Sequence, residues 1–306
     1  MRTNKAYLEL TQSFSGKTRR NFPIKRLTTM KVGGVADVVV EAKTKAQLIE
    51  VLKVIRKLKL NYFVIAGGSN LVFSDQGFRG VIVHNLADQI KVDKRQVVVD
   101  AGCRLQKLVR DLANKNLGGI DFLANIPGSV GGGVVGNAGC YGKGIGEYVI
   151  SAMVFDMKTG KEKVLLPKQL KFSYRNSLCK AKPNWIVTEV KMKVSPVKKS
   201  VVLKAIEAER MERWHKHPHQ PSAGSFFKNP SGIAVWKLID AAGWRGKKTG
   251  GAQISTKHPN FIINTGGATA KDIKQLARMV QAQVKRDSKV TLETEVRMVD
   301  EKGVVS

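Results

Sequence analysis

The sequence is poor in cysteine and contains no long apolar run. Its three cysteines, Cys103, Cys140 and Cys179, lie far apart and form no Cys-x-x-Cys pair, which argues against a disulfide framework and against a zinc cage. No stretch of about 18 consecutive apolar residues occurs, so the sequence predicts no membrane-spanning helix. Residues 1–16 also lack the apolar centre of a secretory signal peptide. These absences predict a cytoplasmic protein with no disulfides, no bound metal and no membrane insertion.

Acidic residues are scarce as well. The 24 Asp and Glu residues stand against 53 Lys and Arg residues, which gives a formal net charge of +29 and favours an anionic partner such as a nucleic acid, a membrane surface or a phosphorylated metabolite. Aromatic residues make up only 7% of the chain and the basic residues are dispersed over all its segments, so no stacking platform for nucleic acid is evident. We therefore expect incidental adhesion to RNA and no specific nucleic-acid partner, with a nucleic-acid-binding protein as the competing hypothesis.

One histidine series could suggest a metal site. His215, His217 and His219 alternate along the chain, but on a helix their side chains would diverge by about 200° per step of two residues, and Pro218 interrupts the element. The series predicts a solvated linker.

The spacing of apolar residues predicts an α+β fold in two domains. A length of 306 residues favours about two domains, and Ser195–Ser200 has the composition of a boundary, so we expect domains at 1–197 and 198–306. A loop is expected at 218–230. The predicted strands are 36–41, 62–66, 71–73, 80–83, 97–100, 149–156, 162–166, 185–194, 260–264 and 290–299, and the predicted helices are 44–58, 104–116, 201–215, 232–242 and 269–287.

Glycine is concentrated in two places. Nine of the nineteen residues in Gly128–Gly146 are glycine, and since each costs about 1 kcal/mol relative to alanine in a helix, this stretch is predicted to be loop. Its Gly-x-Gly-x-x-Gly spacing at 131, 133 and 136 would by itself suggest a Rossmann site. Such a site needs a buried strand before the motif and a helix that opens on its last glycine, but here Pro127 precedes it and further glycines follow. A long glycine-rich loop instead favours a diphosphate cradle, whereas the shorter Gly67–Asn70 segment taken alone favours a tight turn.

Six blocks of the sequence resemble a known family. Ile126–Gly142 and Ala66–Leu71 resemble the flavin-dependent UDP-N-acetylenolpyruvoylglucosamine reductases, and the remaining blocks follow in the family's order over residues 28–296. These are Thr28–Gly34, Phe172–Ser177, Gly224–Pro230 and Leu292–Val296. The chain length is similar to that of the shorter, second type of this enzyme.

The resemblance implies a fold, a reaction and two cofactors. The fold would be the FAD-binding vanillyl-alcohol-oxidase (PCMH-type) fold, with FAD between subdomains at about 20–86 and 87–197 and a substrate-binding domain at 198–306. The reaction would be NADPH-driven reduction, through FAD, of the enolpyruvyl ether of UDP-N-acetylglucosamine to UDP-N-acetylmuramate in peptidoglycan precursor synthesis. We expect a monomer. The cofactor-binding residues would be Gly67, Gly68, Ser69, Asn70, Leu71, Pro127, Gly128, Ser129, Gly132, Asn137, Ala138 and Gly139.

Three residues match the family's catalytic groups. Hydride delivered from flavin N5 leaves negative charge beside the substrate carboxylate, and the Arg175 guanidinium would stabilise that charge as it develops. Ser225 would donate the proton, although a turn or helix-cap serine is its simpler interpretation. Glu295, expected on the final strand, would help to stabilise or relay the proton. Glu293 would point to the same side of that strand, so the alternation of side chains along a strand does not choose between the two glutamates, and the spacing in the family selects Glu295.

Substrate contacts are implied at Tyr174, Lys228, Asn229 and Arg297, with Arg297 on the strand face of Glu295. Asn229 together with Pro230 could equally form a plain turn. The chain departs from the family at Gly133 and Gly136, where bulkier residues are usual, and in a short link at 218–221. These departures bear on loop rigidity and FAD affinity. An alcohol oxidase on the same fold is the alternative chemistry.

Overall fold

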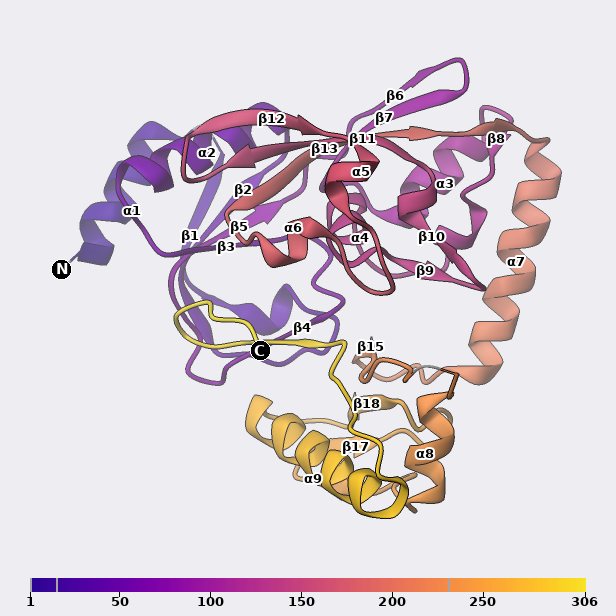
Figure 1. The fold of residues 1–306 in the computed structure, drawn as a ribbon. Helices are drawn as coiled ribbons and strands as arrows, with labels where there is room; N and C mark the ends of the chain where they lie inside the picture. The colour runs from indigo at the N-terminus through magenta and orange to yellow at the C-terminus, as the bar shows by residue number, and fades with distance from the viewer. Residues whose placement is uncertain (1, 15, 231) are drawn as a thin grey trace. The chain divides into compact units, whose positions relative to one another are not determined.

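The chain forms two compact units, each assembled from three separate segments. The structure, a computed structural model, describes residues 2–14, 16–230 and 232–306, with side chains from residue 8 onward. Unit 1 comprises Met1–Arg20, Val38–Gly67 and Gly80–Met211, and unit 2 comprises Asn21–Asp37, Gly68–Arg79 and Glu212–Ser306. Figure 1 shows the path of the chain through helices and strands.

The first sheet has the strand order β1-β2-β5-β3. Its strands are β1 (Lys17–Pro23), β2 (Val35–Ala42), β3 (Tyr62–Ile65) and β5 (Phe78–Asn85). Helix α2 (Lys45–Lys57) begins as the sequence predicts, because the Thr44 hydroxyl accepts the Gln47 N–H at 3.1 Å. It buries Leu48, Val51, Leu52 and Ile55 in a core. The same core also contains Leu10, in α1 (Arg2–Ser13), and Phe14, which follows that helix.

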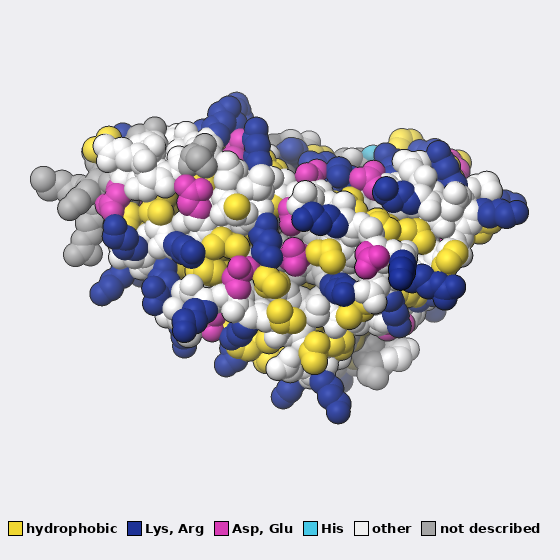
Figure 2. All heavy atoms as spheres, turned by 90° about the horizontal axis from the view of Figure 1, so that it is seen from above, with side chains coloured by type: hydrophobic (Ala, Val, Ile, Leu, Met, Phe, Trp, Pro, Cys, Tyr) yellow, Lys and Arg dark blue, Asp and Glu magenta, His cyan; other side chains and the backbone are white. Residues whose placement is uncertain are grey.

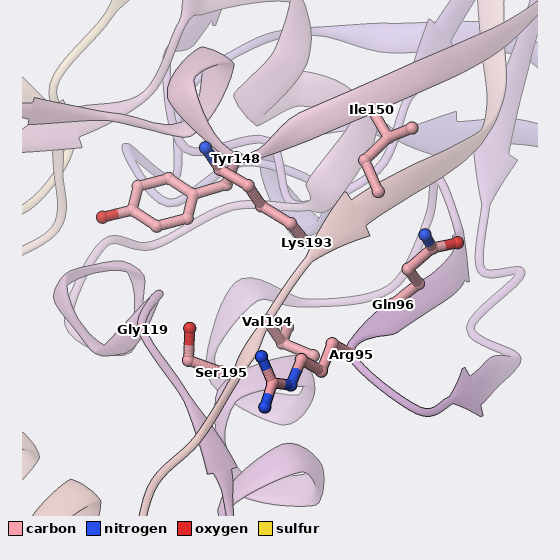
Figure 3. Close-up of a pocket in the computed structure, with 8 residues that line it drawn as sticks. All are labelled: Arg95, Gln96, Gly119, Tyr148, Ile150, Lys193, Val194 and Ser195. Atoms are coloured by element: carbon pink, nitrogen blue, oxygen red, sulfur yellow. The ribbon is translucent and has the colours of Figure 1, made fainter.

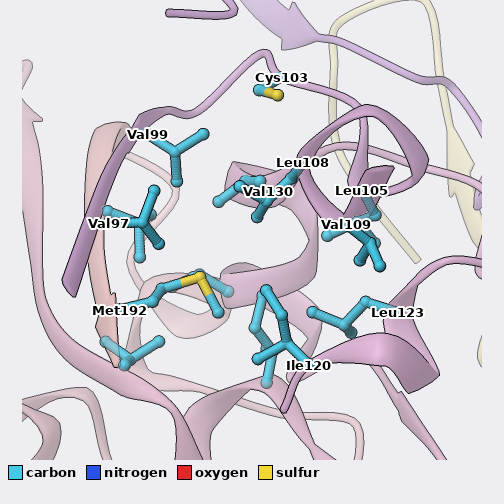
Figure 4. Close-up of a cluster of buried hydrophobic side chains, with 14 of the residues drawn as sticks. Val97, Val99, Cys103, Leu105, Leu108, Val109, Ile120, Leu123, Val130 and Met192 are labelled. Carbon is cyan, nitrogen blue, oxygen red and sulfur yellow. The ribbon is translucent and has the colours of Figure 1, made fainter. Parts of the chain in front are cut away.

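The second sheet of unit 1 has the order β12-β11-β13-β7-β6, and every pair in it is antiparallel. The strands are β6 (Ile90–Asp93), β7 (Gln96–Asp100), β11 (Val149–Asp156), β12 (Lys161–Leu165) and β13 (Trp185–Lys193). Helix α3 (Leu105–Ala113) packs its apolar stripe into a second core, against apolar side chains of β7 and β13 (Figure 4). The smaller elements are β8 (Leu117–Gly118), η2 (Asp121–Leu123), β9 (Gly139–Cys140), β10 (Lys143–Gly144), η3 (Ile145–Glu147), α5 (Pro167–Leu170), α6 (Leu178–Ala181) and β14 (Ser195–Pro196).

The prediction that all of Gly128–Gly146 is loop is wrong, because Val130–Gly136 forms helix α4. The Ser129 hydroxyl caps it by accepting the Gly132 N–H at 3.3 Å, and Val130 and Val134 are fully buried. A Cβ on Gly131 would lie 2.8 Å from that of Ala101. The glycines therefore allow close packing, and burial outweighs their low helix propensity. The element before α4 is η2 and not a strand, so the spacing still gives no Rossmann site.

Unit 2 contains a sheet of order β15-β18-β17-β16. Its strands are β15 (Ser222–Ser225), β16 (Lys248–Thr249), β17 (Ala252–Ile254) and β18 (Phe261–Asn264), so the loop expected at 218–230 contains a short strand. Helices α8 (Val235–Ala241) and α9 (Ala270–Ser288) pack with this sheet around Ile239, Ile273 and Val280 (Figure 1). Two further elements are η1 (Ile24–Arg26) and β4 (Leu71–Phe73), and α7 (Lys199–Lys216) has residues in both units.

The closing strand is much shorter than the predicted 290–299. Only Arg297–Val299 forms a strand, β19, which pairs in parallel with β4. The preceding residues run along 226–228 instead, with one isolated bridge between Thr294 and Phe227. Because the segment changes partner near Val296, it cannot continue one regular ladder, and neither Glu293 nor Glu295 lies on a strand.

The compact units do not coincide with the predicted domains at 1–197 and 198–306, which stay a prediction. Two early segments, Asn21–Asp37 and Gly68–Arg79, group with the C-terminal residues, and the last segment of unit 1 ends at Met211. The physical cause is long-range pairing, since β4 bonds to β19 across more than two hundred residues of sequence.

Candidate functional site

The predicted residues fall into two groups, one in each unit. Unit 1 carries Gly67, Pro127, Gly128, Ser129, Gly132, Asn137, Ala138, Gly139, Tyr174 and Arg175, and unit 2 carries Gly68, Ser69, Asn70, Leu71, Ser225, Lys228, Asn229, Glu295 and Arg297. Each group is described here within its own unit.

In unit 1 the two glycine segments meet main chain to main chain. A Cβ on Gly67 would lie 2.9 Å from the Gly128 Cα, closer than real Cβ contacts. Gly128 has φ +137°, a conformation that favours glycine, and none of the described residues accepts its N–H. Exposed main-chain donors without side chains in the way are what a diphosphate requires. The residues present therefore fit one half of a diphosphate cradle.

The segment after α4 is tied to the loop that carries Arg175. Asn137, with φ 45°, ends α4, and its side chain donates to the Ser173 carbonyl at 2.9 Å and accepts the Gly146 N–H at 3.0 Å. The Arg175 guanidinium donates through Nη1 to the Gly139 carbonyl at 2.9 Å. The structure thus brings together the predicted cofactor residues and the predicted catalytic arginine.

Arg175 sits in a tight turn. Ser173 and Asn176 exchange main-chain hydrogen bonds of 3.1 Å, and Arg175 itself has φ 54°, a region that non-glycine residues adopt rarely. Its guanidinium lies 5.4 Å from the Tyr174 ring centre, and Tyr174 is 56% exposed. A partly buried cation beside an exposed aromatic ring is suited to receive an anionic ligand.

In unit 2 the segment Gly68–Leu71 is held by the C-terminal residues. Gly68 has φ +58°, and a Cβ there would lie 1.9 Å from the Leu27 carbonyl oxygen, so no other residue fits. Asn70 donates through Nδ2 to the Glu295 carbonyl at 3.1 Å and accepts the Arg297 N–H at 3.1 Å through its own carbonyl. The predicted cofactor segment and the predicted catalytic glutamate are therefore neighbours.

Ser225 ends a bulged strand. In the pairing of β15 with β18, Ser222 lies opposite Ile263 and Ser225 opposite Phe261, so β15 has one extra residue. Gly224 supplies the φ of +79° that the bulge uses. None of the described residues hydrogen-bonds the Ser225 hydroxyl, which is half-buried. The hydroxyl is thus available to a ligand.

Glu293 and Glu295, which the alternation of side chains along a strand could not tell apart, make different contacts in the structure. The Glu295 N–H donates to the Phe226 carbonyl at 2.8 Å, next to Ser225. Glu293 is 71% exposed at its side chain and pairs with the Lys228 ammonium at 2.7 Å. Of the two carboxylates, Glu293 is thus already engaged by a lysine, and the main chain of Glu295 is bonded beside the predicted proton donor.

The other two predicted substrate contacts differ from each other. Asn229 accepts the Val235 N–H at 3.1 Å and so anchors the start of α8, as a turn residue would. Arg297 is half-buried on β19, none of the described residues forms an ion pair or side-chain hydrogen bond with it, and burial lowers the pKa of its guanidinium. The Arg297 guanidinium is therefore free to bind an anionic ligand.

Two positioning residues were missed by the sequence analysis. Thr29 donates its N–H to the Gly68 carbonyl at 3.1 Å and its hydroxyl to the Ser222 carbonyl at 2.7 Å, which joins the cofactor segment to β15. Asn260 bonds both the N–H and the carbonyl of Phe227 at 2.9 Å. Both could have been found in the sequence. Thr29 lies inside the family block Thr28–Gly34, and Asn260 is a polar residue at the start of an apolar strand.

The histidine series is partly buried by aromatic contacts. His217 lies 4.9 Å from Phe261 and 5.5 Å from His258 between ring centres. Burial first, and then Arg213 and His258, lower the pKa of His217 to about 4. His219 stacks on Trp214, with 3.9 Å between ring centres.

Among the described residues, no three His, Cys, Asp or Glu side chains gather as a metal site would require. Within the same residues, none of the helices has the length and apolar character needed to span a membrane.

Comparison with known proteins covers almost the whole chain. Residues 36–165 match the FAD binding domain family, and residues 216–299 match the family described as UDP-N-acetylenolpyruvoylglucosamine reductase, C-terminal domain. The UDP-N-acetylenolpyruvoylglucosamine reductase of Clostridium botulinum is 41% identical over 283 residues, which is 92% of each chain. The reductase 1 of Bacillus cereus is 36% identical over 95% of this chain and 97% of its own.

The fold comparison agrees. The crystal structure of the reductase from Thermus caldophilus superposes with a TM-score of 0.77 at 32% identity, covering 92% of this chain and 98% of that one. The predicted FAD-binding fold is confirmed by this match and by the FAD binding domain family. The chain belongs to the UDP-N-acetylenolpyruvoylglucosamine reductase family.

Proposed function

We propose that this protein uses FAD and NADPH to reduce the enolpyruvyl ether of UDP-N-acetylglucosamine to UDP-N-acetylmuramate, a step of peptidoglycan precursor synthesis. The observation that carries the proposal is 41% identity over 92% of the chain to the UDP-N-acetylenolpyruvoylglucosamine reductase of Clostridium botulinum. The glycine segments at Gly67 and Gly128, joined main chain to main chain, support FAD as the cofactor. When bound, FAD supplies the two-electron chemistry that side chains lack.

Arg175, Ser225 and Glu295 are the catalytic residues of this proposal. The reduced enol ether carries negative charge spread into its carboxylate, and the Arg175 guanidinium, held by the Gly139 carbonyl, meets that charge with a forked donor. The Ser225 hydroxyl, which has no partner among the described residues, donates the proton to carbon. Neutral Glu295 then returns a proton to the Ser225 oxygen, which restores the hydroxyl.

Arg297 and Lys228 divide the binding of the anionic substrate. Because Arg297 has no ion-pair partner among the described residues and is half-buried, we assign it a direct contact with a substrate carboxylate or phosphate. Lys228 pairs with Glu293 at 2.7 Å, and the ammonium keeps further N–H donors with which it binds the substrate. Tyr174 packs on the ligand, and Asn229 positions the adjoining chain.

The cellular setting belongs to the proposal as well. Cys103 and Cys179 are buried, Cys140 is half-buried, and all three are free thiols, which suits the reducing cytoplasm. We propose a cytoplasmic monomer. Size-exclusion chromatography with light scattering would give a mass of 33.6 kDa plus FAD, and a mass twice that value would overturn the monomer.

A single spectroscopic series tests the reaction. The purified protein should be yellow, with flavin absorbance near about 450 nm, as for other flavoproteins. Anaerobic NADPH should bleach it, and only the enolpyruvyl sugar, not UDP-N-acetylglucosamine, should restore the colour. Two results would contradict the proposal: a protein that binds no flavin, or a reduced flavin that a simple ketone reoxidises, as expected for the alcohol-oxidase alternative.

A further inference from the structure

Unit 1 contains a cavity of about 320 Å³ that none of the predicted site residues lines (Figure 3). It lies where β7 and β11 begin and β13 ends, beside the turn at Gly119, and its polar lining consists of Arg95, Gln96, Tyr148, Lys193 and Ser195. A volume of this order is at the lower end of the range of small-molecule sites, roughly 300–1,000 Å³. The cavity is therefore large enough for a ligand of mononucleotide size.

The lining is cationic. Arg95 and Lys193 both contribute to it, and none of its residues is acidic. The acid next to Tyr148 in sequence, Glu147, is engaged elsewhere, because its Oε1 accepts the Gly144 N–H at 2.6 Å. Two positive charges without a carboxylate to balance them favour an anion in this space.

The polar side chains around the cavity have no hydrogen-bond or ion-pair partner among the described residues. The Lys193 ammonium lies over the Tyr148 ring, 5.7 Å from its centre. Figure 3 shows Lys193 reaching toward Tyr148 on one side of the cavity and Arg95 near Ser195 on the other.

The backbone holds these groups in place. Lys193 donates its N–H to the Tyr148 carbonyl at 2.8 Å, and Val194 donates to the Arg95 carbonyl at 3.0 Å. The ladder of β11 with β13 is irregular here: Val149 lies opposite Met192 and Ser151 opposite Lys191, so Ile150 is the extra residue of a bulge and lines the cavity. Bulges of this kind are frequent next to binding sites because they redirect side chains.

We propose that this cavity binds a small phosphorylated metabolite of mononucleotide size. The phosphate lies against Arg95 and the Ser195 hydroxyl on one side of the cavity, and the aromatic part of the ligand lies against Tyr148 and Lys193 on the other. The Tyr148 ring is already braced by Phe122, at 5.5 Å between ring centres, so it offers a fixed surface for stacking.

The test is calorimetric titration of adenosine 5′-monophosphate into the FAD-loaded protein saturated with UDP-N-acetylmuramate, which blocks the proposed catalytic site. We expect binding with a Kd of about 0.1–1 mM, weaker binding of inorganic phosphate, and none of adenosine. Arg95→Gln with Lys193→Gln should weaken binding at least about tenfold, because Arg95 forms a charge-assisted contact and Lys193 adds to the positive potential of the cavity. Tyr148→Leu should weaken the nucleotide and leave phosphate unchanged.

A charge-matched control separates the cavity from the general positive field. Lys161→Gln with Lys168→Gln removes the same charge from exposed positions outside the cavity and should change the Kd less than about twofold. The proposal is overturned if the wild type binds no nucleotide at about 10 mM, if the cavity variants bind as well as the wild type, or if UDP-N-acetylmuramate displaces the nucleotide. Failure of UDP-N-acetylmuramate to bind would contradict the proposed function instead, and the variants still decide the cavity.

Discussion

Ser225 shows how a backbone irregularity gives one hydroxyl its place. The bulge in β15 and the positive φ of Gly224 put Ser225 at the end of a short strand, where none of the described residues bonds its hydroxyl. The adjoining Phe226 carbonyl bonds the Glu295 N–H at 2.8 Å. A serine in this setting can act as an acid toward a strongly basic carbon, whereas the hydroxyl of a helix-capping serine is already hydrogen-bonded to the main chain.

Ser225→Ala should block only the second half of the reaction. NADPH should still bleach the flavin at the wild-type rate, while reoxidation by the enolpyruvyl sugar should slow by about 10²–10⁴, the usual loss when a proton donor is removed. Stopped-flow absorbance measures both halves separately. Ser222→Ala on the same strand is the control and should leave both unchanged; equal rates in Ser225→Ala and the wild type would remove Ser225 from the mechanism.

Gly67→Ala should reduce FAD binding. The added Cβ would lie 2.9 Å from the Gly128 Cα, so the two main-chain segments must separate and their donors move from the diphosphate. We expect at least a tenfold loss of FAD affinity, measured as flavin retained after dialysis.

Gly136→Ala is the matched control for that loss. A Cβ there meets nothing within 4 Å, and Gly136 ends helix α4, so alanine should stabilise the protein by about 0.5–1 kcal/mol. Loss of FAD in both variants would mean that any alanine in the glycine-rich region is harmful and that the contact with Gly128 is not the cause.

At the level of elements, short segments far apart in sequence hold one another. Thr29 bonds the Gly68 carbonyl and the Ser222 carbonyl, and Asp75 accepts the N–H groups of Ala270 and Lys271 at 2.8 and 3.0 Å, which caps α9 from the segment that follows β4. Unit 2 is thus assembled from three segments of the chain that long-range hydrogen bonds hold together.

Thr29→Val should destabilise this assembly. Valine has nearly the same shape but leaves the half-buried Ser222 carbonyl without its 2.7 Å hydrogen bond, a loss of about 1–2 kcal/mol. Urea unfolding followed by tryptophan fluorescence measures the change. Thr29→Ser, which keeps the hydroxyl, should lose less than half as much. Unchanged stability in Thr29→Val would show that the hydrogen bond does not stabilise the unit.

For the whole molecule, the net charge of +29 is the dominant property. Figure 2 shows Lys and Arg side chains spread over the visible face with acidic and apolar side chains between them, and not gathered in one stripe. A dispersed charge attracts polyanions without reading their sequence.

Binding of single-stranded RNA should therefore depend on salt and not on sequence. Two 20-nucleotide RNAs of different sequence should bind within about threefold of each other, and both affinities should fall by roughly 10³ or more between 50 and 200 mM salt. Fluorescence anisotropy measures both effects. A tenfold preference for one RNA that persists at high salt would favour the competing hypothesis of a specific nucleic-acid-binding protein.

The sequence by itself determined the local elements and the chemical inventory. Thr44 and Thr269 begin helices where their hydroxyls cap the first turn, and β11 spans the predicted 149–156, because caps and apolar periods act over a few residues. The recognised blocks contain all the residues proposed for catalysis, and they led to the family that comparison confirms.

Only the tertiary structure decided what depends on distant partners. Burial against Ala101 makes a helix of a glycine-rich segment, a change of partner near Val296 ends the pairing that would have made one long strand, and the Glu293 carboxylate pairs with Lys228, 65 residues earlier in the chain. Grouping of Asn21–Asp37 and Gly68–Arg79 with the C-terminal residues follows from the same cause. Contacts between residues far apart in sequence outweigh local propensity, and no local pattern records them.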